Sequence, residues 1–205
     1  MMRIIDWNIS YQNSIATKLE LLERIIAEVD NSYHFVVALQ EVTEKDQIAI
    51  SRSGLLNKHV YSLHYRKPGS LESNNRRLGC LIGISQGLDI SGSSLIDRAL
   101  FPERALCAKI MAGQKEFEVI SFHSLTGVSF KVGKSSQFVV LAEHLNANRD
   151  NPIILCCDLN EPKVDHIDPS EIECFSQAGD KDKYAEYILK PNGIHELEDA
   201  YRLCG

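Results

Sequence analysis

Four short polar clusters stand directly after the most strand-like segments of the sequence, and their side chains are of types that cooperate in hydrolysis. The clusters are Asp6-Trp7-Asn8, Gln40-Glu41, His123-Ser124 and Asp158-Leu159-Asn160-Glu161-Pro162. A single polar residue after a strand is common for solubility alone. Because open α/β sheets gather ligand sites at strand ends, four such clusters favour a shared site. We therefore expect these side chains to meet.

The residue types in the clusters suit metal-assisted chemistry. Glu41 and Asp158 offer hard anionic oxygens of the kind that Mg²⁺ selects. Asn8 and Asn160 offer amide groups that can hold a water, a carboxylate or a phosphate oxygen. His123 adds a group that can carry a proton near neutral pH. Attack of water on a phosphate ester requires charge neutralisation, an oriented nucleophile and a proton donor, and this set supplies all three.

Each of these residues also has a plain structural interpretation. Asn8 could hydrogen-bond at a strand end, and Glu41 could be a solvated strand terminus. Asp158 to Asn160 could form an Asx turn. His123 falls by alternation on an inward face of its strand, so it could be a hydrogen-bonded core histidine.

The elements that must position these residues are predicted from hydrophobic periodicity. The predicted strands are Met2 to Ile9, Phe35 to Leu39, Val60 to Tyr65, Leu78 to Ser85, Leu106 to Met111, Glu116 to Phe122 and Ile153 to Cys157. The predicted helices are Ile15 to Val29 after a Ser14 N-cap, Thr43 to Ile50 and Ser136 to Asn148, with a weak helical pattern at Tyr184 to Leu189 and a short last helix or loop at His195 to Leu203. The strand, helix and strand at the start form a βαβ-like opening. The pattern predicts a single domain over residues 1–205 that becomes irregular towards its end.

Composition narrows the class of protein. The chain has 205 residues and a net charge of −6, a balance that disfavours coating nucleic acid through a broad basic face. It does not exclude an enzyme that touches a few phosphates beside a bound cation. No apolar run approaches the roughly twenty residues of a membrane span, and the early Asp6 argues against a secretory signal, so we expect a cytoplasmic protein. The six cysteines form no CxxC pair, which excludes a zinc ribbon and favours reduced, buried thiols.

Four segments of the chain resemble motifs of the endonuclease/exonuclease/phosphatase superfamily, in that family's order and with compatible spacing. They are Ile5-Asp6-Trp7-Asn8-Ile9, Ala38-Leu39-Gln40-Glu41-Val42, Ser121-Phe122-His123-Ser124 and Cys157-Asp158-Leu159-Asn160. The family includes deoxyribonuclease I, abasic-site endonucleases, sphingomyelinases and inositol-polyphosphate phosphatases. The resemblance extends from Ile4 to about Arg202. It implies an α+β fold: a four-layer α/β/β/α sandwich of two mostly antiparallel sheets with helices outside.

The resemblance also implies roles for individual residues. Glu41 would be the principal Mg²⁺ ligand, with Asn8 beside it in the metal site and Mn²⁺ as an alternative ion. Asp158 would orient and activate the attacking water, and Asn160 would help to hold the phosphate. His123 matches the histidine that contacts the phosphate or assists the leaving group in part of the family. Arg104 falls where many members place a polar residue facing the site, and it would contact the substrate phosphate.

The chain departs from the family pattern near its end. Members usually close with a strand and a Ser-Asp-His motif, whereas this sequence stops at Gly205 without one, and Asp165-His166 comes too early to replace it. Ser10 stands where abasic-site nucleases tend to carry an acid, which weakens that particular assignment. The final strands of the sandwich would then be missing. The unpaired sheet edge would be covered by the stretch after Pro162, by a second copy of the chain in a homo-oligomer, or by residues beyond Gly205.

Two functions remain open on these grounds. The leading one is a Mg²⁺-dependent phosphoesterase, most simply a phosphodiesterase or nuclease. Its substrate would be a nucleic acid, a nucleotide or a phospholipid head group. The rival is a shortened, catalytically silent family member that acts as a binding or structural module, because the missing residues normally contribute orders of magnitude to the rate.

Overall fold

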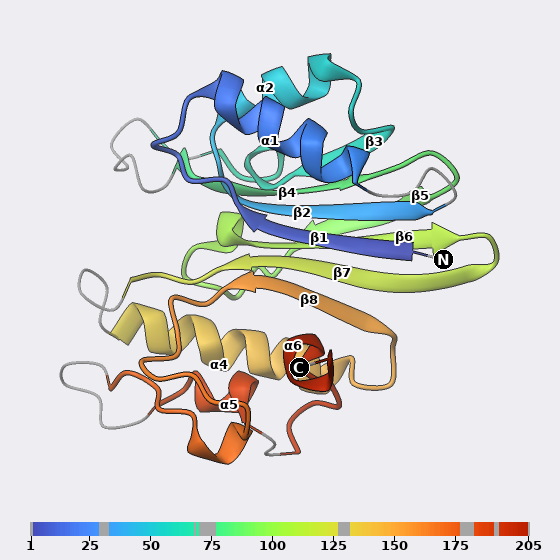
Figure 1. The fold of residues 1–205 in the computed structure, drawn as a ribbon. Coiled ribbons are helices and arrows are strands. Elements are labelled where there is room, and N and C mark those ends of the chain that lie inside the picture. The colour runs from blue at the N-terminus through green and yellow to red at the C-terminus, as the bar shows by residue number, and fades with distance from the viewer. Residues whose placement is uncertain are drawn as a thin grey trace.

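Two four-stranded sheets lie face to face between two layers of helices (Figure 1). The computed structural model describes residues 2–28, 33–67, 69, 77–126, 132–176, 183–190 and 193–204. The first sheet consists of β1 (Met2–Asn8), β2 (His34–Val42), β3 (Lys58–Tyr61) and β4 (Gly79–Ile84), in the order β1-β2-β4-β3. The second consists of β5 (Asp89–Leu95), β6 (Ala105–Ala112), β7 (Lys115–His123) and β8 (Ile153–Asp158), in that order.

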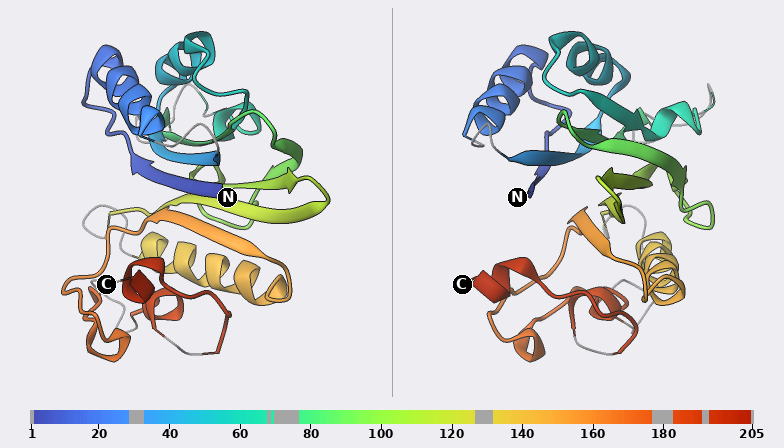
Figure 2. Two further views of the ribbon diagram at one scale, coloured as in Figure 1. Left: turned by 45° about the vertical axis from the view of Figure 1, so that its right-hand side comes forward. Right: turned by 90° about the vertical axis from the view of Figure 1, so that its right-hand side faces the viewer.

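The helices cover the outer faces of both sheets. Helices α1 (Ile15–Ala27) and α2 (Glu44–Ser53) lie over the first sheet, and α4 (Val132–Ala147) lies over the second (Figure 2). The segment after β8 packs beside α4 and contains α5 (Glu186–Leu189) and α6 (Ala200–Cys204). Short 3₁₀ turns are found at η1 (Ser62–His64), η3 (Pro102–Arg104) and η4 (Pro169–Glu171). The predicted four-layer sandwich is confirmed.

Most strand pairs are antiparallel, as expected. The two exceptions are β1 with β2 and β7 with β8, which run parallel. Each parallel pair is joined by a helix, α1 in the first case and α4 in the second, as parallel connections require. The βαβ-like opening predicted from the sequence is therefore correct, and a second such unit follows later in the chain.

Three apolar layers result from the alternation of side chains along the strands. Between the sheets, Val36 and Ala38 of β2 meet Leu106, Ala108 and other residues of the second sheet. The opposite face of β2, with Val37 and Leu39, packs under α1 and α2. A third layer joins the outer face of the second sheet to α4 through residues such as Phe122 and Phe138, and the segment after β8 adds to it.

The element predictions differ from the structure in three places, one of which is α4: it begins at Val132, four residues before the predicted Ser136. Strand β5 was not predicted because its sequence, DISGSSL, has few β-branched or apolar residues and packs mainly by pairing with β6. The strand expected at Val60 to Tyr65 ends at Tyr61, where Ser62 begins a 3₁₀ turn and its hydroxyl caps the backbone N–H of Cys80. The Ser14 N-cap is confirmed, since its side chain accepts a hydrogen bond from the Thr17 amide. Val29, the predicted helix end, lies outside the described residues.

One side of the sandwich has an open pair of edges. β1 ends one sheet and β8 ends the other, and within the described ranges neither has a strand partner on its outer side. The segment after Pro162 packs on the outer face of the second sheet and, within the described ranges, adds no strand to this edge. A side chain bridges the two edges: the Asp6 carboxylate accepts hydrogen bonds from the Gln40 amide at 2.7 Å and from the backbone N–H of Cys157 at 2.8 Å.

Candidate active site

Four strands deliver the predicted site residues to one end of the sandwich, which we call the site rim. The two parallel pairs place Asn8 beside Gln40 and His123 beside Asp158, so all four carboxyl ends reach the same end. The two sheets are joined there by a direct contact, because the Asn8 side-chain amide donates to Asp158 Oδ2 at 2.7 Å. Residues 150 positions apart in the sequence thus form one hydrogen bond across the sandwich.

Glu41 reaches the rim through an irregularity in β2. The pairing of β2 with β4 shifts register between Leu39 and Val42, and Glu41 has a positive φ of 57°. Such a bulge re-aims a side chain at a strand end. The Glu41 carboxylate accepts the Tyr11 backbone N–H at 3.0 Å through Oε2, while Oε1 lies 3.7 Å from His123 Nε2 on the other sheet.

Backbone strain is concentrated at this rim. In the described part of the chain, the non-glycine residues with positive φ are Ser10, Glu41 and Asn160, at 50°, 57° and 49°. Ser10 and Asn160 follow the rim ends of β1 and β8, and Glu41 is the last but one residue of β2. Left-handed backbone at residues other than glycine costs on the order of 1 kcal/mol each and clusters at functional sites. The rim therefore carries strain that the rest of the fold must hold in place.

His123 is buried and held in one tautomer. Arg104 Nη1 lies 3.3 Å from His123 Nδ1 and 3.4 Å from the Ser124 carbonyl oxygen. A guanidinium has only donors, so Nδ1 must accept and the neutral ring carries its proton on Nε2. Nε2 faces the two carboxylates of the rim, at 3.7 Å from Glu41 and 3.9 Å from Asp158. Burial and the Arg104 cation lower the pKa of His123 from 6.5 to about 4, against the opposing pull of the two carboxylates.

Asp158 and Asn160 form a compact turn after β8. The Asp158 carboxylate accepts the Asn8 amide through Oδ2 and the Asn160 backbone N–H through Oδ1 at 3.0 Å. The Asn160 side-chain amide donates to the Ser124 carbonyl at 3.2 Å. The Asx turn considered from the sequence is present, and it lies at the rim together with the other predicted residues.

Arg104 lies behind the histidine ring. It is 5% exposed, and its Nη1 contacts His123 and the Ser124 carbonyl oxygen in the loop after β7. The structure therefore places it against His123, on the side of the ring away from the two carboxylates.

Two residues that the sequence did not mark hold groups of the rim: Lys134 holds the loop after β8, and Tyr11 holds Glu41. Lys134, in the first turn of α4, donates to the Asn160 carbonyl at 2.8 Å and to Glu161 Oε1 at 2.7 Å, and both side chains are almost completely buried. Tyr11 supplies the backbone N–H that holds Glu41. A lysine at the start of a helix is an ordinary feature, so the only signal for Lys134 was its place next to a motif-bearing segment.

The donor set at Glu41 fits a divalent cation. Within the described residues, Glu41 Oε1 takes no N–H hydrogen bond, and it lies 3.7 Å from His123 Nε2. Asn8 Oδ1 accepts the Ser10 amide at 2.9 Å and keeps a second lone pair. Mg²⁺ is commonly held by one or two carboxylates, with waters and substrate phosphate oxygens completing the shell. The residues present agree with that pattern.

A pocket of about 810 Å³ adjoins the Glu41 side of the rim. Tyr11, whose amide holds Glu41, lines it together with Lys67, Arg77 and His64. The buried pair of Lys18 and Asp46 lies at its base (2.9 Å). The pocket is of the size that binds small organic ligands, and it presents cations and an exposed aromatic ring.

The architecture and the rim together define a DNase I-like fold, the fold of the superfamily that the four motifs resemble. Solved structures share it. Caenorhabditis elegans TDP2 matches with a TM-score of 0.57 and 18% identity over 80% of this chain and 49% of its own. The human Nocturnin catalytic domain matches with a TM-score of 0.55 and 23% identity over 79% and 66%. ANGEL2, described as a 2′,3′-cyclic phosphatase, matches with a TM-score of 0.50 and 15% identity over 78% and 52%.

These similarities establish the fold. The chain spans about half the length of the TDP2 and ANGEL2 chains and about two thirds of the Nocturnin domain. No protein-family model and no curated protein sequence matches the chain.

Proposed function

We propose that the protein is a Mg²⁺-dependent phosphodiesterase. The observation that carries this proposal is the meeting of Asn8, Glu41, His123, Asp158 and Asn160 at one rim, from strands of both sheets. The supporting comparison is with the structures that share the fold. ANGEL2 is a 2′,3′-cyclic phosphatase, and the Nocturnin catalytic domain was solved with a bound sulfate anion.

Glu41, with Asn8 beside it, would hold the cation. When bound there, Mg²⁺ would neutralise phosphate charge and make the phosphorus more susceptible to attack, and Mn²⁺ would be an alternative.

Asp158 would accept a proton from the attacking water. Its carboxylate is aimed by the Asn8 amide on one oxygen and the Asn160 backbone on the other. Asn160 would place its side-chain amide beside a phosphate oxygen. His123 would act as a neutral hydrogen-bond donor, because its low pKa keeps the Nε2 proton on an uncharged ring at neutral pH. Arg104 would act through His123 by fixing its tautomer, so we assign it a positioning role in place of the direct phosphate contact expected from the sequence.

The pocket beside Glu41 favours a diester over a monoester. A substituent on the phosphate would extend from the rim into this space, past Tyr11 and towards Lys67 and Arg77. Its volume of about 810 Å³ suits a group the size of a nucleoside, and the two cations suit a further phosphate. We therefore propose a nucleotide or a short nucleic acid as the substrate class, ahead of a lipid head group.

The reduced state of all six cysteines fits the cytoplasm as the compartment of the protein.

Hydrolysis of bis-p-nitrophenyl phosphate, with EDTA, Mg²⁺ or Mn²⁺, tests the proposal. We expect metal-dependent turnover that falls by about 100-fold or more in Asp158→Ala and Glu41→Gln, because each removes a group acting on the reacting atoms. The matched controls are Asp150→Ala and Glu20→Gln, which alter exposed carboxylates away from the rim. They should retain wild-type rates.

Substrate preference is tested with the p-nitrophenyl ester of thymidine 5′-monophosphate. We expect Tyr11→Ala to raise KM for this nucleotide ester and to leave the rate on bis-p-nitrophenyl phosphate nearly unchanged. Turnover that is unaffected by EDTA, or by the Asp158 and Glu41 substitutions, would contradict the assigned site. A folded protein that hydrolyses neither ester would support the binding-module alternative.

A further inference from the structure

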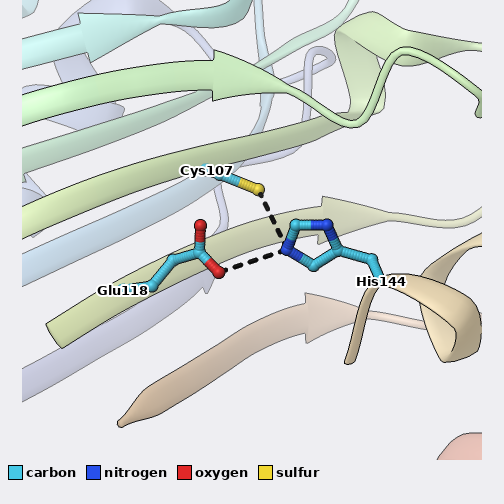
Figure 3. Close-up of side chains that lie close together, drawn as sticks. All are labelled: Cys107, Glu118 and His144. Carbon is cyan, nitrogen blue, oxygen red and sulfur yellow. Dashed lines mark hydrogen bonds and ion pairs between the residues drawn. The ribbon is translucent and has the colours of Figure 1, made fainter. Parts of the chain in front are cut away.

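A second group of ligand-type side chains lies on the far side of the second sheet from the first sheet. Cys107 of β6, Glu118 of β7 and His144 of α4 converge in the layer between the sheet and the helix (Figure 3). Their ligand atoms all lie within 4.8 Å of one another. Among the described residues this is the one group of three or more such side chains that meets this distance. No motif of the sequence marks His144 as a site residue.

The imidazole nitrogen is the centre of the group. His144 Nε2 lies 3.1 Å from Glu118 Oε2 and 3.9 Å from Cys107 Sγ (Figure 3). In a tetrahedral zinc site with ordinary bond lengths, the nitrogen–oxygen and nitrogen–sulfur separations are about 3.4 Å and about 3.6 Å. The observed separations differ from these by about 0.3 Å each. Small side-chain rotations would therefore place all three ligand atoms around one ion.

Hydrogen bonds within the group satisfy only some of its three ligand atoms. One ring nitrogen offers either one proton or one lone pair, yet it faces two partners. A cation among the three atoms would satisfy the nitrogen, the sulfur and the carboxylate oxygen at once. The thiolate and carboxylate would carry two negative charges, which a divalent ion neutralises.

The surroundings suit a structural ion. The three ligands come from three regular elements, and β6 and β7 are fixed by their pairing, in which Cys107 lies opposite Ile120. Cys107 is buried, whereas the side chains of Glu118 and His144 are 16% and 23% exposed. Solvent therefore reaches one side of the group, where a water would complete four-fold coordination.

The ligand types select the metal. A thiolate, an imidazole and a carboxylate favour Zn²⁺ and disfavour Mg²⁺, which takes oxygen ligands. This distinguishes the group from the rim, where oxygen donors from Glu41 and Asn8 fit Mg²⁺. One protein would then bind two different cations, one at the rim and one between the second sheet and α4.

We propose that Cys107, Glu118 and His144 form a zinc site that fastens α4 to the second sheet. On binding, the Cys107 thiol releases its proton to solvent and the sulfur bonds to the ion, with no change of oxidation state. The same helix carries Lys134 and Gln137, which hold the Asn160 carbonyl and the Leu125 amide near the rim. Zinc therefore stabilises the helix that supports the loop after β8, at a distance from the reacting atoms.

Cobalt binding to the metal-free protein tests the site. Co²⁺ substitutes for zinc and gives a thiolate-to-cobalt absorption band, and intense visible bands when it is tetrahedral. We expect one equivalent of Co²⁺ to give both features and one equivalent of Zn²⁺ to abolish them, with excess Mg²⁺ having no effect. Bound Zn²⁺ should also raise the melting temperature.

Variants decide which residues are responsible. Cys107→Ser should lose the thiolate band, and His144→Gln and Glu118→Gln should each weaken Zn²⁺ binding at least about tenfold. Two variants serve as controls: Cys204→Ser, which removes an exposed thiol, and Glu41→Gln, which removes a rim carboxylate. Both should bind Zn²⁺ and Co²⁺ at this site as the wild type does. A wild-type protein without the band, or a band that survives Cys107→Ser, would overturn the proposal. Circular dichroism of each variant separates lost binding from lost folding, and no readout depends on hydrolysis.

Discussion

At the scale of single residues, hydrogen bonds from neighbouring side chains fix the orientation of the groups at the rim. Asn8, Asn160 and Arg104 each fix a group that would do chemistry: Asn8 and Asn160 hold the Asp158 carboxylate, and Arg104 holds the His123 ring. The motifs predicted which residues meet at the rim, because polar groups after buried strands are visible in a sequence. They did not predict the aiming contacts, which join residues up to 150 positions apart.

The protonation state of the His123 ring tests whether Arg104 fixes its orientation and tautomer. In metal-free protein at about pH 5, nitrogen NMR should show a neutral ring with its proton on Nε2, because the pKa is lowered from 6.5 to about 4. Arg104→Met removes a cation that disfavours the charged ring, so the pKa should rise. A ring that is already charged at this pH in the wild type, or one protonated on Nδ1 alone, would refute the arrangement.

Ser10 offers a test of the backbone strain at the rim. Its φ of 50° is one that glycine adopts freely. We expect Ser10→Gly to raise the free energy of unfolding by up to about 1 kcal/mol, since relief of strain outweighs the added freedom of the unfolded chain. Urea denaturation measures the change. Ser10→Ala keeps the strained backbone and should give no gain, so an equal gain in both variants would contradict the explanation.

At the scale of elements, the sequence predicted the strands that lead to the site better than the strands that surround it. β1, β2, β7 and β8 are rich in β-branched and apolar residues, and that density is a strong local signal. β2 is buried on both faces, whereas β1 and β8 are half-buried strands at the sheet edges. β5 lies at a sheet edge with a small, polar sequence and was missed. The four-layer architecture followed from the resemblance, since periodicity alone predicted an α/β domain without the number of sheets.

A buried ion pair joins the two helices over the first sheet. Lys18 of α1 and Asp46 of α2 lie 2.9 Å apart with side chains 5% and 3% exposed, and Asp46 also accepts hydrogen bonds from Thr43 in the capping box of α2. Asp46→Ala should lower the free energy of unfolding by about 3–5 kcal/mol, because it strands a buried ammonium and removes the cap.

Lys18→Met is the informative comparison for this pair. It leaves the capping contacts of Asp46 in place and supplies an apolar side chain of similar length, so a smaller loss is expected. Both losses are measured by urea denaturation followed by circular dichroism. Equal losses in the two variants would show that the cap contributes nothing beyond the ion pair.

At the scale of the whole molecule, β1 and β8 form a side with two sheet edges that have no further strand partner within the described ranges. The backbone carbonyls of Pro152 and Asp158 point towards β7. Because backbone groups alternate in direction along a strand, those of the odd-numbered residues of β8 point away from β7, to the outer side of the sheet edge. Of these, the Cys157 amide is held by Asp6. Ile153 and Leu155 have no strand partner on that side within the described ranges.

Amide hydrogen exchange should reveal this edge. We expect the Ile153 and Leu155 amides to exchange much faster than those of Ile154 and Cys156, which face β7. The measurement at low and high protein concentration also tests the homo-oligomer expected from the sequence. Protection of Ile153 and Leu155 that grows with concentration would indicate a second copy on the edge, and protection at all concentrations would contradict an open edge.

None of the helices in the described part of the chain has the length and apolar character needed to cross a bilayer.

The division of the rim between two sheets has a consequence for the order in which the protein folds. The Asn8–Asp158 hydrogen bond and the contact of Gln40 with Ser121 join segments 150 and 81 residues apart, whereas the helices and hairpins form from near neighbours. Contacts that close long loops form late and slowly. During refolding, the helical signal should therefore recover first, and the fully assembled rim should be among the last features to return.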